Sequence, residues 1–314
     1  MKRPEFELID WIRSQVRDRE PVLLGIGDDA ACLRPAVDRE VLVAIDMLME
    51  GVHFTFPDAT PELAGRKALA VNLSDIAAMA GEPTAVFVSV ALPNDRGVEF
   101  ARRVHAGLIE LADEFGIVVA GGDTNSWNGP LVISVTVTGQ QIGPRPILRS
   151  GAMPGDWLFV TGKLGGSLGS KHHLTFTPRL AEARALVNMV ELHAMMDISD
   201  GLAADLHHVL NASRVGALLE AEEIPLTEWD RAARDGHSPL RHGLSDGEDF
   251  ELLFAVSPDQ GKQLVSQWTE TTPITKIGEI NKSEGCQIRY ADGRIEPLDP
   301  IGWTHSIGEG IASD

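Results

Sequence analysis

The chain has 314 residues, more than the roughly 100–200 of a typical single domain, so two domains are expected. Hydrophobic residues make up 43% and charged residues 23%, which is enough apolar material for a sizeable core. The 27 Lys and Arg against 46 Asp and Glu give a net charge of −19, which argues against nucleic acid or an anionic membrane as a partner. An anionic small substrate would need metal cations to neutralise its site.

Cysteine usage and the N-terminal segment favour a cytoplasmic protein. Cys32 and Cys286 are too far apart in sequence to form a CxxC zinc site or a disulfide framework. Residues 1–7 carry two glutamates where a signal peptide needs an apolar core. The longest apolar stretches, such as Ala85–Leu92, are far shorter than the roughly 18 residues that span a membrane.

The first half alternates short strands with helices, which predicts an α/β or α+β domain over residues 1–142. One helix is expected to begin at Thr60-Pro61, with Thr60 as N-cap and Pro61 at the first helical position, and to end near Ala80. Asn94 or Asp95 is the predicted cap of a second amphipathic helix. Strands are predicted at Val22–Leu24, Val41–Ile45, Ala85–Leu92, Ile117–Ala120 and Leu131–Thr138.

The second half reads as a further mixed domain, over residues 143–314. Its first segment, Gly143–Asp156, is rich in Gly, Pro and Arg and is the expected connection between the domains. Helices are predicted at Pro178–Val190 and from a Ser199 or Asp200 cap to about Ala212. Strands are predicted at Trp157–Thr161, Glu251–Val256 and Cys286–Tyr290.

Aspartates recur where strands end, often beside glycines that let a ligand approach the backbone. Several such carboxylates brought together would repel one another unless a cation neutralised them. Oxygen ligands without sulfur favour Mg²⁺, which commonly bridges to phosphate oxygens. The acids so placed are Asp28, Asp29, Asp46, Asp123, Asp197 and Asp200, with a further acidic knot at Asp246, Glu248 and Asp249. Asp75 lies instead on the predicted helix, where Asn72, three residues earlier, projects from the same face.

Other site chemistries fit less well. The Walker phosphate loop is absent, and the GxGxx[GA] match at residues 25–30 is followed too soon by Pro35 for the helix of a dinucleotide site. The adjacent pairs His172-His173 and His207-His208 have diverging side chains, so surface or capping roles are expected rather than zinc ligation. No GxSxG nucleophile elbow occurs.

Seven segments together, and in the same order, resemble thiamine-monophosphate kinase, and they cover the chain nearly end to end. They are GIGDDAACL (25–33), DMLMEGVHF (46–54), KALAVNLSDIAAMAGEP (67–83), GGDTN (121–125), RSGAMPGDWLFVTGKLGGS (149–167), MDISDGLAADLHH (196–208) and DGEDFELLF (246–254). The resemblance implies the two-domain fold of aminoimidazole-ribonucleotide synthetase, with N-terminal sheets paired into a barrel across a homodimer. ATP and several Mg²⁺ ions would bind between the domains, and ATP would phosphorylate thiamine monophosphate to thiamine diphosphate.

The resemblance also assigns roles by position. The metal ligands would be Asp29, Asp46, Asp75, Asp123, Asp197 and Asp200, with Asp28 in support, and Asp29, Asp75, Asp123 and Asp200 among them would be catalytic. ATP would contact Gly122, Asp123, Arg149 and Ser199. Thiamine monophosphate would face His53, Glu248 and the C-terminal aromatic residue Trp303.

The sequence departs from the family pattern at three places. Ala44-Ile45 precede Asp46 where the family usually has Ser or Thr, so we expect a weaker Mg²⁺ requirement at one subsite. The segment Gly165–Arg179 is short, and Pro300 stands where a bulky residue is expected. Two other functions therefore stay open: a superfamily relative with a different acceptor, and a non-catalytic nucleotide-binding dimer.

Overall fold

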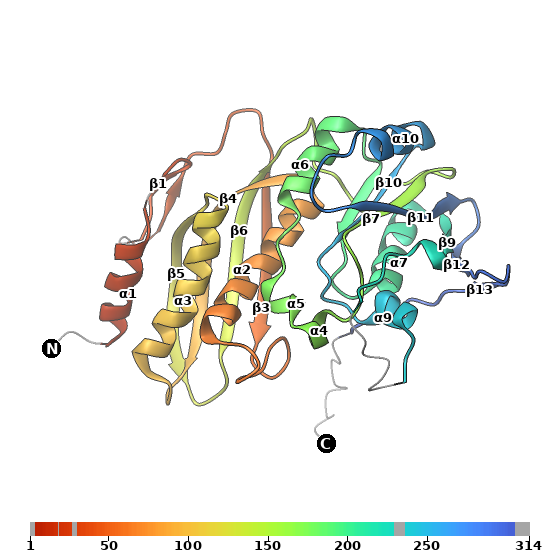
Figure 1. Ribbon diagram of the computed structural model, residues 1–314. Coiled ribbons are helices and arrows are strands. Elements are labelled where there is room, and N and C mark those ends of the chain that lie inside the picture. The colour runs from red at the N-terminus through yellow and green to blue at the C-terminus, as the bar shows by residue number, and fades with distance from the viewer. Residues whose placement is uncertain (1–3, 18, 27–29, 229–235, 305–314) are drawn as a thin grey trace, which may run out of the picture.

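The computed structural model describes residues 4–17, 19–26, 30–228 and 236–304. Its N-terminal half contains three helices and six strands among these residues (Figure 1). In chain order they are α1 (Pro4–Gln15), β1 (Val22–Leu24), β2 (Cys32–Leu33), β3 (Val41–Met49), α2 (Pro61–Ala78), β4 (Gly81–Pro93), α3 (Gly97–Glu114), β5 (Val118–Trp127) and β6 (Val132–Gln141).

Four of these strands form one sheet in the order β3-β6-β4-β5. Strand β6 is antiparallel to both β3 and β4, whereas β4 and β5 run parallel. Helices α2 and α3 cover one face of the sheet (Figure 1). Alternate residues of β3 and β6, among them Leu42, Leu48 and Val135, are buried against these helices.

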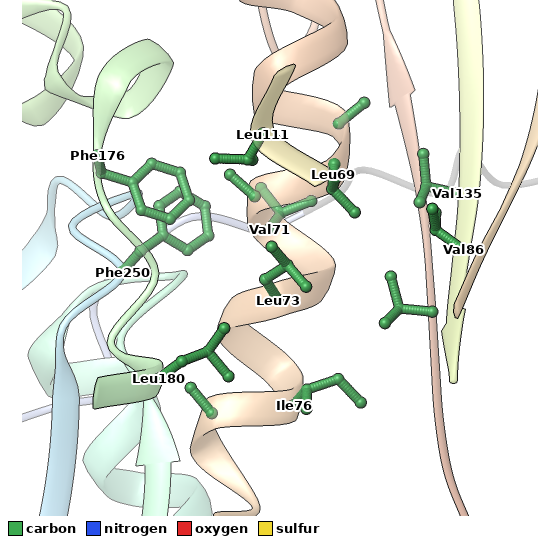
Figure 2. Packing of buried hydrophobic residues seen from close by; sticks show 14 of the residues in the cluster. Leu69, Val71, Leu73, Ile76, Val86, Leu111, Val135, Phe176, Leu180 and Phe250 are labelled. Carbon is green, nitrogen blue, oxygen red and sulfur yellow. The ribbon is translucent and has the colours of Figure 1, made fainter. Parts of the chain in front are cut away.

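Helix α2 lies at the centre of the molecule. Its start is well defined, because Thr60 Oγ1 accepts a 3.3 Å hydrogen bond from the Leu63 N–H and Pro61 occupies the first turn. A helix that is apolar on most sides must be covered on most sides. Figure 2 shows how this is met: Val86 and Val135 of the sheet lie on one side of α2, and Phe176 and Phe250 of the C-terminal half lie on the other.

The C-terminal half is built on a seven-stranded sheet with the order β13-β12-β9-β11-β7-β10-β8, in which only β9 and β12 pair in parallel. Its strands are β7 (Trp157–Thr161), β8 (Ala194–Asp197), β9 (Gly216–Glu220), β10 (Leu252–Val256), β11 (Ile274–Asn281), β12 (Gly285–Arg289) and β13 (Ile295–Pro297). Its helices are α4 (Ser167–Ser170), α5 (His172–Thr175), α6 (Leu180–Met189), α7 (Leu202–Ser213), the 3-10 turn η1 (Ala221–Glu223), α9 (Pro239–Ser245) and α10 (Pro258–Gln267).

The mixed α/β class is confirmed, but several predicted element ends are wrong. Strands β3 and β5 continue past the predicted ends, so Asp46 and Asp123 lie within strands instead of after them. Helix α3 begins at Gly97 after Arg96, which makes no side-chain cap, so neither Asn94 nor Asp95 caps it.

The start of α7 also differs from the prediction. The helix begins after Gly201, and neither Ser199 nor Asp200 is its cap. Instead, the Asp205 carboxylate accepts hydrogen bonds of 3.0 and 3.1 Å from the backbone N–H groups of Asp200 and Gly201. A residue of the helix itself therefore accepts the hydrogen bonds of the turn after β8. The Asp200 side chain is not used as the helix cap.

Candidate active site

A cavity of about 370 Å³ lies between the two halves of the chain. The N-terminal half contributes side chains of β3, α2 and the loop between them, and the C-terminal half contributes the turn after β8 and the loop before β10. Eight of the predicted site residues line it: His53, Asp46, Asp75, Asp197, Ser199, Asp200, Glu248 and Trp303. The structure thus brings together acids that are 202 positions apart at the extremes, Asp46 and Glu248.

Three carboxyl groups in this cavity lie close enough to influence one another's pKa. Asp46 and Asp75 hydrogen-bond each other, and Asp197 accepts a 2.7 Å hydrogen bond from Ser74 Oγ. Burial raises the pKa of all three, and the charges of Asp197 and Asp46 add to burial in raising the pKa of Asp75 to about 8. Such a group is stabilised by a cation, and its oxygen-only donors suit Mg²⁺.

Arg149 provides positive charge beside these acids. It lies in the segment between β6 and β7, and its charge opposes the rise in the pKa values of Asp75 and Asp197. The Ser213 hydroxyl of α7 donates a 3.3 Å hydrogen bond to the Arg149 carbonyl, which ties the segment to the C-terminal half. A guanidinium at this place is suited to a phosphate group that approaches the acidic cluster.

A second possible cation site extends from Asp200 along α7. The ligand atoms of Asp200, Asp205 and His208 all lie within 4.8 Å of one another. Burial, together with the charges of Asp197 and Asp200, raises the pKa of Asp205 to about 8. This group was not predicted from the sequence, because His208 was considered only together with its neighbour His207. The i, i+3 spacing of Asp205 and His208 on one helix was the available signal.

The side of the cavity where His53, Glu248 and Trp303 lie contains a buried ion pair that was not predicted from the sequence. Lys67 of α2 is fully buried and donates to both oxygens of Glu248, at 2.7 and 2.8 Å. His53 Nδ1 accepts a 3.0 Å hydrogen bond from the Met49 N–H, which places the proton of the neutral ring on Nε2. Trp303, about half exposed, is held by its backbone N–H on the Asp200 carbonyl at 2.9 Å.

Asp123 and Gly122 do not line this cavity within a single chain. Both residues border a different cavity, next to α1. Strand β5, which carries them, is three places from β3 in the sheet, or about 14 Å from Asp46 at the usual strand spacing. Gly122 also has a packing role, because a Cβ there would lie 2.0 Å from the Val88 carbonyl oxygen.

Two further predicted residues cannot be placed, since Asp28 and Asp29 lie outside the described residues. Within the part of the chain that is described, no helix is both long and apolar enough to cross a membrane.

The chain is similar to known proteins over most of its length. Family models for the N-terminal and C-terminal domains of AIR synthase related proteins match residues 27–141 and 154–291. A thiamine-monophosphate kinase of Rhodopirellula baltica is 39% identical, with 96% of this chain and 97% of the relative covered. The crystal structure of thiamine-monophosphate kinase from Stenotrophomonas maltophilia K279a has a TM-score of 0.79 at 33% identity and covers 92% of this chain and 97% of its own.

A structure of AaThiL complexed with AMPPCP and TMP has a TM-score of 0.75 at 30% identity and covers 98% of this chain and 99% of its own. The chain therefore belongs to the AIR synthase related proteins and, within them, to the thiamine-monophosphate kinase family. Its fold is the two-domain AIR synthase-like fold that the sequence resemblance implied.

Proposed function

We propose that the chain transfers the γ-phosphoryl group of ATP directly to thiamine monophosphate, giving ADP and thiamine diphosphate. The observation that carries the proposal is the cavity between the halves, in which Asp46, Asp75 and Asp197 interact on one side and Glu248 and His53 lie on the other. The AMPPCP and TMP complex of a 30% identical protein supports the same pair of ligands.

The chemistry of the acceptor explains why the site needs carboxylates. A phosphate monoester has a second pKa near ~6, so the acceptor is largely dianionic at neutral pH and needs no strong general base. The obstacle is repulsion between two polyanions, which is overcome by positioning and by fixed positive charge. Arg149 provides such charge from the protein, as a fork that matches phosphate oxygens.

The buried acids fit Mg²⁺ because they are hard oxygen donors, and a bound cation would favour the charged form that their burial disfavours. We propose that Asp46, Asp75, Asp197 and Asp200 hold several Mg²⁺ ions, with Asp28 and Asp29 as further ligands. Bound Mg²⁺ would neutralise the phosphate oxygens and hold donor and acceptor in line. Ser199 and Arg149 would orient ATP, and His53, Glu248 and Trp303 would orient thiamine monophosphate.

We also propose a cytoplasmic homodimer, divided into domains at residues 142 and 143, in which a second copy completes each site. Asp123 faces away from the cavity of its own chain, on the sheet face that α2 and α3 leave uncovered. That face is apolar on β3, where Val43, Ile45 and Met47 are 64%, 66% and 56% exposed. A partner sheet that covered this face would bring the partner's Asp123 and Gly122 toward the ATP-binding side.

The proposal predicts that ADP release from Mg-ATP depends on thiamine monophosphate and yields a product with the mass of thiamine diphosphate. Asp75→Asn should lower kcat at least ~100-fold, because the γ-phosphate would lose charge stabilisation in the transition state. Asp259→Asn, on an exposed aspartate of α10, is the matched control and should keep full activity.

Three results would separate the alternatives. Release of ADP with another phosphate monoester, but not with thiamine monophosphate, would indicate a superfamily relative with a changed acceptor. Binding of Mg-ATP without any acceptor-dependent turnover would indicate the non-catalytic dimer. An Asp75→Asn variant as active as the Asp259→Asn control would contradict the assignment of this cavity as the active site.

A further inference from the structure

Lys67 is the one lysine among the described residues that lines the cavity between the two halves, and its ammonium group is hydrogen-bonded entirely within the protein. Its Nζ donates to the His53 carbonyl at 2.6 Å and to the two Glu248 oxygens at 2.7 and 2.8 Å. An ammonium group has three protons, so these three acceptors use them all. Lys67 is also 0% exposed, so it cannot serve as a phosphate ligand in the way that a loop lysine does.

The two residues whose oxygens accept hydrogen bonds from Lys67 come from different halves of the chain. His53 precedes α2 in the N-terminal half, and Glu248 precedes β10 in the C-terminal half, yet both line the cavity. Lys67 therefore fixes one wall of the cavity to the other at the side where the acceptor is expected. Truncating its side chain would release both contacts at once.

Glu248 is held in an otherwise unfavourable conformation. Its φ of 56° lies in the left-handed region, which is uncommon for residues other than glycine. Three contacts keep it there: the Lys67 ion pair, a 2.7 Å hydrogen bond from its N–H to the Ser199 carbonyl, and a 2.6 Å bond from Ser167 Oγ to its carbonyl. A backbone constrained to this degree aims the carboxylate at one place.

The ion pair also gives the Glu248 carboxylate a different character from the aspartates across the cavity. Burial raises the pKa of Glu248, and the Lys67 charge opposes that rise. Since the Lys67–Glu248 pair is neutral as a whole, it has little attraction for Mg²⁺, unlike the cluster of Asp46 and Asp75. A carboxylate has about four lone-pair positions, and Lys67 occupies two, so the others can accept hydrogen bonds from a ligand.

We propose that Lys67 is a positioning residue for the acceptor, holding Glu248 and the His53 loop so that they recognise an amino-bearing heteroaromatic ring. The inference rests on the proposed function, because thiamine monophosphate carries an aminopyrimidine ring at the end opposite its phosphate. Lys67 thereby separates the cavity into a metal-binding side and a ring-binding side. It acts only through Glu248 and His53 and contacts neither substrate.

The test is a comparison of KM values in Lys67→Met, whose side chain is similar in length but uncharged. We expect the KM for thiamine monophosphate to rise on the order of tenfold or more, as for a disturbed charge-assisted hydrogen bond. The KM for ATP and the Mg²⁺ concentration for half-maximal activity should change less than about twofold. A role in stability alone would not produce this difference between the two substrates.

Lys67→Met also leaves Glu248 buried without its cation, which can destabilise the fold. The double variant Lys67→Met/Glu248→Gln removes both charges and should recover most of the lost melting temperature. Its KM for thiamine monophosphate should nevertheless stay high, because the oriented carboxylate is still missing. A double variant with a wild-type KM for this substrate would overturn the inference.

Arg179→Met provides a matched control in the C-terminal half of the chain. Arg179 forms a comparably buried ion pair with Glu251, at 2.6 and 2.7 Å, but neither residue lines the cavity. We expect a lower melting temperature with both KM values unchanged. An equal rise of both KM values in Lys67→Met would overturn the inference alone, whereas a wild-type chain without acceptor-dependent ADP release would overturn the proposed function.

Discussion

Asp75 lies between two other carboxyl groups. This environment favours metal binding, but it lowers the stability of the folded protein when no metal is bound. Burial, together with the charges of Asp197 and Asp46, raises its pKa to about 8. An Asp in the unfolded chain has a pKa near ~3.9, so the folded chain binds this proton more tightly. The contribution of Asp75 to the stability of the metal-free protein is therefore fully present below about pH 4 and is lost as the pH rises through about 8.

Asp75→Asn should consequently raise the melting temperature of the metal-free protein at pH 8, although it abolishes activity. A gain of about 1–2 kcal/mol corresponds to several degrees for a chain of this size. Thermal unfolding in EDTA at pH 5 and pH 8 measures this, and the difference between variant and wild type should be larger at pH 8. Added Mg²⁺ with ATP should stabilise the wild type more than the variant. A variant that is less stable than wild type in EDTA at both pH values would contradict the account.

Among the elements, α2 determines how the site is assembled, because Lys67, Ser74 and Asp75 all lie on it. Its position depends on a close crossing with α3 at two glycines. A Cβ on Gly65 would lie 1.9 Å from the Val104 carbonyl oxygen, and one on Gly107 would lie 2.0 Å from the Glu62 carbonyl oxygen. Backbone atoms cannot move aside as a flexible side chain can, so even one methyl group must separate the helices.

Gly107→Ala is therefore expected to destabilise the protein by about 3 kcal/mol, although alanine is the better helix former. The urea midpoint of unfolding measures the effect. Glu110→Ala, at an exposed position of the same helix, is the control and should stay within about 0.5 kcal/mol of wild type. If Gly107→Ala matched that control, the two helices would be free to shift apart, and the crossing would not constrain the position of α2.

The start of α2 could be predicted because its cap is local: Thr60 and Pro61 act on their own helix. The ends of β3 and β5 could not be predicted, because aspartate is a poor strand former. Each strand continues beyond its aspartate only because it pairs with a strand that is distant in the sequence. The α7 cap was missed for a similar reason, since Asp205 satisfies backbone groups from inside the helix.

The same limit applies to the site. The positions of Asp46, Asp75, Asp197 and Asp200 beside one cavity follow the sequence resemblance, but spacing alone could not separate Asp123 from them. Lys67 gave no signal as a site residue, because lysines are seldom fully buried and its partners are far away in the sequence.

For the molecule as a whole, the four-stranded sheet has one face covered by α2 and α3, and β3 leaves apolar side chains exposed on the other. Asp123 belongs to the second face, since the ladder aligns it with Ser89, Ser134 and then Met47. Asp46 has the opposite orientation, toward Asp75 of α2. Within one chain Asp46 and Asp123 therefore point to opposite faces of the sheet, and in the proposed homodimer Asp123 would come from a second copy.

This arrangement predicts that inactive variants restore one another when they are mixed. Asp75→Asn and Asp123→Asn should each be inactive alone. A mixed dimer should contain one site with both substitutions and one with neither, provided that each site combines Asp75 of one copy with Asp123 of the partner subunit. Co-expression should then recover roughly a quarter of wild-type activity, because about half of the dimers are mixed and half of their sites are intact. Tandem purification on two different tags would isolate the mixed dimer, whose activity should approach half of wild type. No recovery in that purified dimer would mean that Asp123 acts within its own chain or has no part in the site.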